Sequence, residues 1–295
     1  MGVLPIKLKG MKKFREKIPK FAGKKIALFG VYVLFIFLSS FSFLLFFDFI
    51  PLFFNSDGTF GMIWLWIPVI GVLLLEIIGL ILVYQMWFWR DRLRKKYGEL
   101  SYQKVFLVGF AGILMLITIS FHTFIPFYFV NSKFWSSNLY YFFTTPFTSF
   151  FLSISLVLDI IRVLIGVIIT IIAILMMIRS LMTFGFDYMT VTYLYFPEES
   201  SLQNNEIYSV IRHPMYSGLI ILCFGGYILH FNLYSALFFI IYYLGFSFHI
   251  IFVEDKELIK RFGDSYKKYR NDVPAFLPYP NKLKTFFRFI IVKNQ

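Results

Sequence analysis

The chain has few of the residues on which secreted and soluble proteins depend. It contains one cysteine, Cys223, so no intramolecular disulfide can form. Its four histidines are scattered, so no metal-ligand spacing occurs and no metal site is expected. Charged residues make up 15% of the 295 residues, against about a quarter in soluble domains. These shortages exclude a disulfide scaffold, a disordered chain and a soluble enzyme.

Long apolar runs take the place of the missing polar residues. Hydrophobic residues make up 59% of the chain and aromatic residues 22%. A run of about 20 apolar residues is long enough to cross a bilayer as a helix. The sequence therefore predicts an all-α polytopic membrane protein with about six transmembrane helices, the last two forming a hairpin that turns near Phe231. The runs are Ile26–Phe54, Phe60–Trp89, Val105–Val130, Ser149–Ile178, Pro214–His230 and Asn232–Val253.

The basic residues behind the net charge of +13 are unevenly placed. They cluster before the first run, in residues 90–104 and after residue 254, whereas residues 55–59 have none. This alternation follows the positive-inside rule and predicts that both termini are cytosolic. The positive charge therefore predicts that anionic lipids are attracted to the basic termini. It does not indicate nucleic-acid binding. Apolar residues of 283–290 recur at helical spacing, which predicts an amphipathic tail helix at the inner leaflet.

The chain divides into three expected regions. Residues 1–25 form a basic cytosolic segment, residues 26–178 a region of four spans, and residues 179–295 a core with the hairpin and the tail. The aromatic stretch 184–196 is expected to be an interfacial belt or one wall of a ligand pocket.

The residues before the fifth run suggest an anion-binding helix start. Pro214 disfavours the α conformation for His213 and suits the first position of a helix. The first N–H groups of that helix, from Met215 and Tyr216, attract anions, and Arg212 and His213 add donors. Gly218 is expected to let a flat or bulky group approach the backbone. The alternative is an ordinary helix start with Arg212 on a lipid phosphate.

Two carboxylates after the last run lack a basic partner on their own helix. These are Glu254 and Asp255, whereas Glu257 has Lys260 and Arg261 at helical spacing and is expected to form a solvated pair. An antiparallel hairpin would bring both carboxylates to the corner at Arg212. The alternative is a purely structural salt bridge from Glu254 to Arg212.

A pocket with a positive helix end on one side and carboxylates on the other suits a zwitterionic ligand rich in hydroxyls. S-adenosylmethionine has the matching parts: a carboxylate, an ammonium group, a ribose diol and an adenine that an aromatic ring can cover.

The motifs of residues 208–278 follow one another in a recognisable order. They are Tyr208, then RHPMYSG from Arg212, EDKEL from Glu254, FGDSYKKY from Phe262 and VPAFLP from Val273. This order resembles the C-terminal core of the isoprenylcysteine carboxyl methyltransferase and phospholipid methyltransferase superfamily. The resemblance implies that Tyr208, residues 213–216 and Glu254 contact S-adenosylmethionine, in a cytosol-facing pocket with a lipid-side channel to the acceptor.

The expected cofactor site combines the residue argument with this resemblance. It comprises Tyr208, Arg212, His213, Pro214, Met215, Tyr216, Gly218, Glu254 and Asp255. No catalytic residue is assigned, but His249 or Asp255 could deprotonate an amine acceptor. The chain departs from the family in having Asn205-Glu206-Ile207 before the tyrosine. It also has Ile250 where isoprenylcysteine enzymes carry a substrate-binding arginine.

The leading hypothesis is therefore an integral-membrane methyltransferase that uses S-adenosylmethionine. Its acceptor would come from the bilayer, as a prenylcysteine-like carboxylate, a phospholipid or another small lipophilic molecule. One alternative is an NADPH-dependent sterol or steroid reductase, although two carboxylates would repel its phosphates. Another is a non-catalytic transporter or lipid-binding protein, in which the charged residues Asp159 and Arg162 of the fourth run would be the functional pair.

Overall fold

A computed structural model describes residues 26–53, 61–125, 142–151, 154–185, 196 and 199–291. The basic segment 1–25 and the loop 55–59 lie outside the described residues, as do 186–195 of the aromatic stretch. Every regular element in the described part is helical, so the expected all-α class is confirmed.

Among the described residues, five helices are long and apolar enough to cross a membrane, and a sixth apolar helix is shorter. Helix α9 has 17 residues, or about 25 Å at 1.5 Å per residue, against about 30 Å of hydrocarbon. The second apolar run is broken at residues 65–66, so the short helix α3 (Gly61–Trp64) precedes α4. The spans run along α2 (Ile26–Phe53), α4 (Ile67–Tyr97), α5 (Tyr102–His122), α7 (Ser155–Phe184), α9 (Pro214–His230) and α10 (Leu233–His249).

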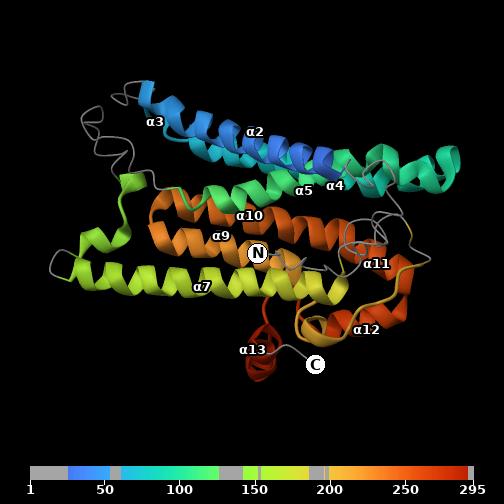
Figure 1. The fold of residues 1–295 in the computed structure, drawn as a ribbon. Helices are drawn as coiled ribbons and strands as arrows, with labels where there is room; N and C mark the ends of the chain where they lie inside the picture. The colour runs from blue at the N-terminus through green and yellow to red at the C-terminus, as the bar shows by residue number, and fades with distance from the viewer. Residues whose placement is uncertain are drawn as a thin grey trace, which may run out of the picture.

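The helices form a bundle with α9 and α10 in the middle. In Figure 1, α2, α4 and α5 lie on one side of this pair and α7 lies on the other. Helix α9 approaches its neighbours closely because two successive residues have no side chain. A Cβ on Gly225 would lie 2.6 Å from Thr170 of α7, and one on Gly226 would lie 2.3 Å from Thr123 at the end of α5. Helix α9 is thus packed closely between α7 and the end of α5.

The predicted hairpin turns where the sequence places it. Phe231 adopts the left-handed conformation that ends α9, and the side chain of Asn232 accepts a hydrogen bond from the backbone N–H of Ser235 to begin α10. Two buried tyrosines then anchor α10, since Tyr234 donates to the carbonyl of Leu65 and Tyr242 to that of Leu116.

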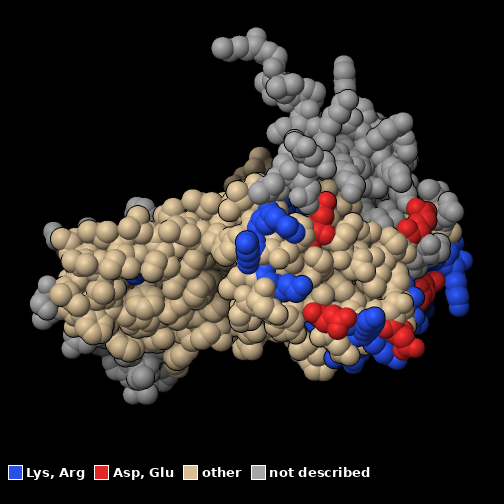
Figure 2. All heavy atoms as spheres, turned by 90° about the horizontal axis from the view of Figure 1, so that it is seen from below, with Lys and Arg blue, Asp and Glu red and all other residues tan. Residues whose placement is uncertain are grey.

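Beyond α10 the chain folds back across one end of the bundle. A π-helical turn, η10 (Ile250–Glu254), leads into α11 (Asp255–Phe262), followed by α12 (Asp264–Asp272). Lys, Arg, Asp and Glu gather at this end of the face drawn in Figure 2, and the rest of that face is nearly devoid of them. The charge pattern indicates that this end lies in water and the remainder in lipid.

The C-terminal helix α13 (Leu283–Ile291) does not rest on lipid alone. Phe286 and Ile290 are buried against α7 and the 3-10 turn η9 (Glu206–Ser209), while Phe287 and Ile291 are exposed. The tail helix is amphipathic, as expected, but it also packs on the protein. The boundary expected at residue 178 falls within α7, which continues to Phe184, so the two regions share a helix.

Candidate active site

The site begins at the start of α9. His213 has φ −122° and ψ 60°, outside the helical region, and Pro214 is the first helical residue, as predicted. The carbonyl of His213 accepts the backbone N–H of Ser217 at 2.9 Å. Met215 and Tyr216 lie between them, and their N–H groups have no partner within the helix. This end of α9 therefore presents donors and a positive dipole.

The C-terminal segment fixes the approach to this helix. The backbone N–H of Arg212 donates to the carbonyl of Pro274 at 2.9 Å, and that of His213 donates to Ala275 at 3.1 Å. The guanidinium Nε of Arg212 also donates to the carbonyl of Val273 at 2.8 Å. The Val-Pro-Ala motif is thus a strap that holds the two residues before α9.

Both acidic residues face the corner before α9, as the hairpin argument predicted. Glu254 Oε1 lies 3.6 Å from His213 Nδ1, and Asp255 Oδ1 lies 3.6 Å from His213 Nε2. Both carboxylates are buried. The π turn before them is a feature that often marks functional sites, and it brings two consecutive side chains to the same imidazole.

The two carboxylates have different surroundings. Asp255 Oδ1 accepts Arg212 Nη1 at 2.9 Å and the hydroxyl of Tyr266, and Arg270 lies 3.7 Å from Oδ2. Asp255 therefore has three partners besides His213, and its ion pair with Arg212 has a structural role. The salt bridge considered between Glu254 and Arg212 is formed by Asp255 instead.

Glu257 pairs with Arg261 at the expected helical spacing, but the expectation that this pair is solvated is wrong. Its Oε1 accepts Arg90 Nη1 of α4 at 2.7 Å, and the side chain of Arg90 is only 7% exposed. The same oxygen accepts Arg261 at 3.1 Å, and Arg261 in turn donates to Ser200. Glu257 therefore ties α11 to α4 and to the segment before η9.

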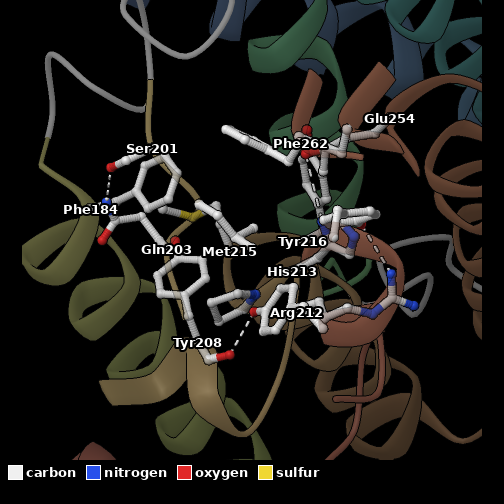
Figure 3. A pocket seen from close by; sticks show the side chains of 15 residues that line it. Phe184, Ser201, Gln203, Tyr208, Arg212, His213, Met215, Tyr216, Glu254 and Phe262 are labelled. Carbon is white, nitrogen blue, oxygen red and sulfur yellow. Dashed lines mark hydrogen bonds and ion pairs between the residues drawn. The ribbon is translucent and has the colours of Figure 1, made fainter. Parts of the chain in front are cut away.

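A cavity, here called the α9 cavity, opens between these elements. Its volume is about 110 Å³, and it opens to solvent. Figure 3 shows Phe184, Tyr208 and Met215 on one side and Tyr216, Glu254 and Phe262 on the other. Ser201 and Gln203 line it as well. The walls thus combine aromatic faces with a few polar groups.

Tyr208 is held in place at both ends. Its hydroxyl lies 2.9 Å from Ser180 Oγ, its carbonyl accepts the hydroxyl of Tyr269 at 2.6 Å, and its ring stacks on Phe184 with centroids 5.0 Å apart. Burial raises the pKa of Tyr208, so its hydroxyl stays protonated. Phe184, the first residue of the aromatic stretch 184–196, lines the cavity, as one of the two expectations for that stretch required.

His213 carries the cationic character of the cavity. Burial by itself would lower its pKa, but the carboxylates of Glu254 and Asp255 outweigh burial and raise the pKa of His213 above the ordinary 6.5. The imidazole is therefore more readily protonated than in water, and it adds positive charge beside the start of α9.

The structure brings together most of the expected cofactor site. Gly218 and Asp255 do not line the cavity. A Cβ on Gly218 would lie 2.4 Å from Met177 of α7, so this glycine serves helix packing and does not admit a ligand. The expected residues that line the cavity are Tyr208, Arg212, His213, Pro214, Met215, Tyr216 and Glu254.

Several lining residues were not assigned from the sequence. Phe262, Tyr266 and Tyr269 lie in a motif that carried the family resemblance but had no stated role. Ser201 and Gln203 precede η9 in a segment with no sequence signal.

A second hollow lies against lipid between α4 and α10 and is here called the α4–α10 groove. It is almost wholly apolar, and its open space is about 1010 Å³. His249 links it to the α9 cavity, because its ring stands perpendicular to that of Tyr216 with centroids 6.3 Å apart. The groove is lined by Ile77, Leu80, Ile81 and Tyr84 of α4 and by Gly245, Phe248, His249, Phe252 and Val253.

These features define a polytopic membrane protein with a polar cavity at its charged end and an apolar groove beside it. Residues 161–265 match the phospholipid methyltransferase family. This match confirms the resemblance inferred from the motifs, and it covers most of α7, all of α9 and α10, and both acidic residues of the corner.

One curated relative is the protein-S-isoprenylcysteine O-methyltransferase of Schizosaccharomyces pombe. The two sequences are 38% identical over 77 residues, which is 26% of this chain and 33% of that protein. The chain thus matches about a third of the relative's length. No solved structure matches the chain.

Proposed function

We propose that the chain is an integral-membrane methyltransferase that uses S-adenosylmethionine and methylates a lipid-soluble acceptor. The observation that carries the proposal is the α9 cavity, in which the imidazole of His213 and a helix start face the buried carboxylate of Glu254. The family match over the same residues supports it. The core would be residues 179–295 together with the end of α7, and residues 26–178 would frame the acceptor path.

The polar groups of the cavity fit the parts of this cofactor. The first N–H groups of α9 and the imidazole of His213 would hold its carboxylate. Glu254 would accept hydrogen bonds from its ammonium or its ribose hydroxyls. Phe184, Tyr208 and Phe262 would cover the adenine, since aromatic faces stack on flat rings.

When bound, S-adenosylmethionine supplies a methyl group on a sulfonium sulfur, whose carbon–sulfur electron pair stays on sulfur as the methyl leaves. The protein's contribution is chiefly positioning. The strap at residues 273–275, the buried Asp255–Arg212 pair and the π turn hold the cavity residues rigidly. Holding two reactants in the reactive geometry accounts for about 7–11 kcal/mol of a barrier in favourable cases.

The alternatives fit these residues less well. A reductase cofactor carries several phosphates, and the carboxylate of Glu254 in the cavity wall would repel them. The pair considered for a transporter lies at the far end of α7, where Arg162 binds Asp159 at 2.9 Å and the carbonyl of Leu229. Arg162 also cannot replace the arginine that is absent at Ile250, which argues against a carboxylate acceptor.

The charge pattern supports an orientation with the α9 cavity in the cytosol. The C-terminal end of α4, which carries the basic residues beyond Trp89, lies at the same end of the bundle as α11 and α12 (Figure 1), and positive loops stay on the cytosolic side. We propose that both termini are cytosolic and that anionic lipids contact the basic segments.

Calorimetry with the purified full-length chain in phosphatidylcholine nanodiscs tests the proposal. S-adenosylmethionine should bind, and NADPH should give no heat under the same conditions. Binding of NADPH alone would favour the reductase, and binding of neither would favour a non-catalytic protein.

A further inference from the structure

The α4–α10 groove contains a buried polar atom with no partner. Its walls are hydrocarbon and aromatic rings apart from His249 and the hydroxyl of Tyr84. His249 is 3% exposed, and its Nε2 has no hydrogen-bond partner among the described residues. An unsatisfied buried polar group destabilises a fold, so a nitrogen kept in this state is a candidate for binding a ligand.

His249 lies between the two hollows. It lines the α4–α10 groove, and its ring meets the edge of Tyr216, which lines the α9 cavity. On the π turn, two consecutive residues line different hollows: Val253 lines the groove and Glu254 lines the cavity. A molecule lying in the groove would therefore present its end at the imidazole, beside the cofactor position.

We infer that the imidazole of His249 contacts the head group of the methyl acceptor, whose hydrocarbon tail lies in the α4–α10 groove. This inference rests on the proposed function and extends it to the acceptor. The groove follows α4 from Ile77 to Tyr84, or about 10 Å at the rise of a helix. Its outer walls, such as Ile81 and Phe252, are about half exposed, so a tail can enter sideways from the bilayer.

The surroundings of His249 select the chemistry of that head. The groups that face the imidazole are Glu254 on the π turn, His213 and Tyr216 at the α9 start, and Tyr84 on α4. No lysine or arginine lines the groove, so a carboxylate head would lack a fixed cation. A head that carries a proton on nitrogen or oxygen can donate a hydrogen bond to Nε2.

The step assigned to His249 is a proton transfer. The ammonium form of an amine head, or a hydroxyl head, loses one proton, Nε2 gains it, and the neutral imidazole becomes an imidazolium. The head keeps the lone pair that forms the new bond to the methyl carbon. Removal of such a proton by a positioned base contributes about 10²–10⁴-fold to the rate of a reaction.

Nitrogen NMR of the protein labelled with ¹⁵N-histidine tests the contact without measuring turnover. The sequence has four histidines, and His249→Gln assigns the signal of His249 by its loss. The probe is dodecylamine, added to the full-length chain in phosphatidylcholine nanodiscs. The His249 signal should shift and saturate as dodecylamine is added. Dodecane, which has the tail and no head, should not produce this shift.

The matched control is His230, at the opposite end of α9, whose Nε2 also has no partner among the described residues. Its signal should stay fixed. An unchanged His249 signal, or equal shifts at both histidines, would overturn the inference. So would a larger shift with dodecanoate, because it would indicate an anionic head.

Cofactor binding separates this inference from the proposed function. Calorimetry should give the same affinity for S-adenosylmethionine in the wild-type protein and in His249→Gln. If the cofactor binds and dodecylamine does not move the His249 signal, the inference alone fails. If dodecylamine moves that signal and the cofactor does not bind, the proposed function fails.

Discussion

Replacing Glu254 by glutamine probes the α9 cavity most selectively. The substitution keeps the size of the side chain and removes its charge. Glu254 lies 3.6 Å from His213 in the cavity wall, whereas Arg212 is paired with Asp255 at 2.9 Å. The change should therefore weaken cofactor binding while leaving the Arg212 ion pair intact.

The expected size follows from the interactions lost. A hydrogen bond to a charged group contributes about 1.5–3 kcal/mol, and each 1.4 kcal/mol is about tenfold in affinity. Calorimetry should show S-adenosylmethionine binding about 10-fold to 100-fold more weakly to Glu254→Gln than to the wild-type protein.

Two further variants make this result interpretable. Asp255→Asn removes the partner of buried Arg212, and breaking a buried pair costs about 3–5 kcal/mol. It should mainly lower the thermal stability of the cofactor-free protein. Asp264→Asn is the charge control, because Asp264 is an exposed acid that pairs only with Lys267 among the described residues. Equal loss of affinity in Glu254→Gln and Asp264→Asn would refute the assigned contact.

The remaining predictions concern pH, topology and the acceptor. The pKa of His213 is raised in the folded state, so the protonated imidazole stabilises the fold fully below about pH 6.5. That stability is lost as the pH rises through the folded-state pKa. Thermal unfolding of the wild-type protein should show this loss and His213→Gln should not; identical pH profiles would contradict it. Cysteine labelling of intact cells should place residues 90–104 and residues 264–291 on the same side of the membrane, and opposite sides would rule out the proposed orientation. Because Ile250 stands in place of an arginine, S-farnesylcysteine should be a poor methyl acceptor in a radiolabel assay, and efficient methylation would show that another group binds its carboxylate.

Local signals account for what the sequence predicted well. Pro214 fixes where α9 begins, because proline suits the first helical position and constrains the residue before it. The turn at Phe231 follows from two apolar runs that have almost no residues between them. These two points and the helical rise were enough to bring Glu254 and Asp255 to the corner at His213.

The errors come from contacts between distant segments. Glu257 has two basic residues at helical spacing, but its closest partner is Arg90, 167 residues earlier. Glu254 lines the cavity and Asp255 forms the ion pair because of the π turn and of Tyr266. Neither feature has a spacing signal in the sequence. Gly218 was predicted to admit a ligand, but it packs against Met177 instead. The sequence does not reveal this contact, because it forms only in the folded bundle.

Transfer of a labelled methyl group tests the central claim most directly. Purified wild-type protein would be incubated with S-[methyl-³H]adenosylmethionine and a total lipid extract in nanodiscs, and the organic phase would then be counted. The account predicts label in the organic phase with the wild-type protein and about 10-fold to 100-fold less with Glu254→Gln at subsaturating cofactor. Bound cofactor with no label in the lipid phase, or equal label with both proteins, would contradict it.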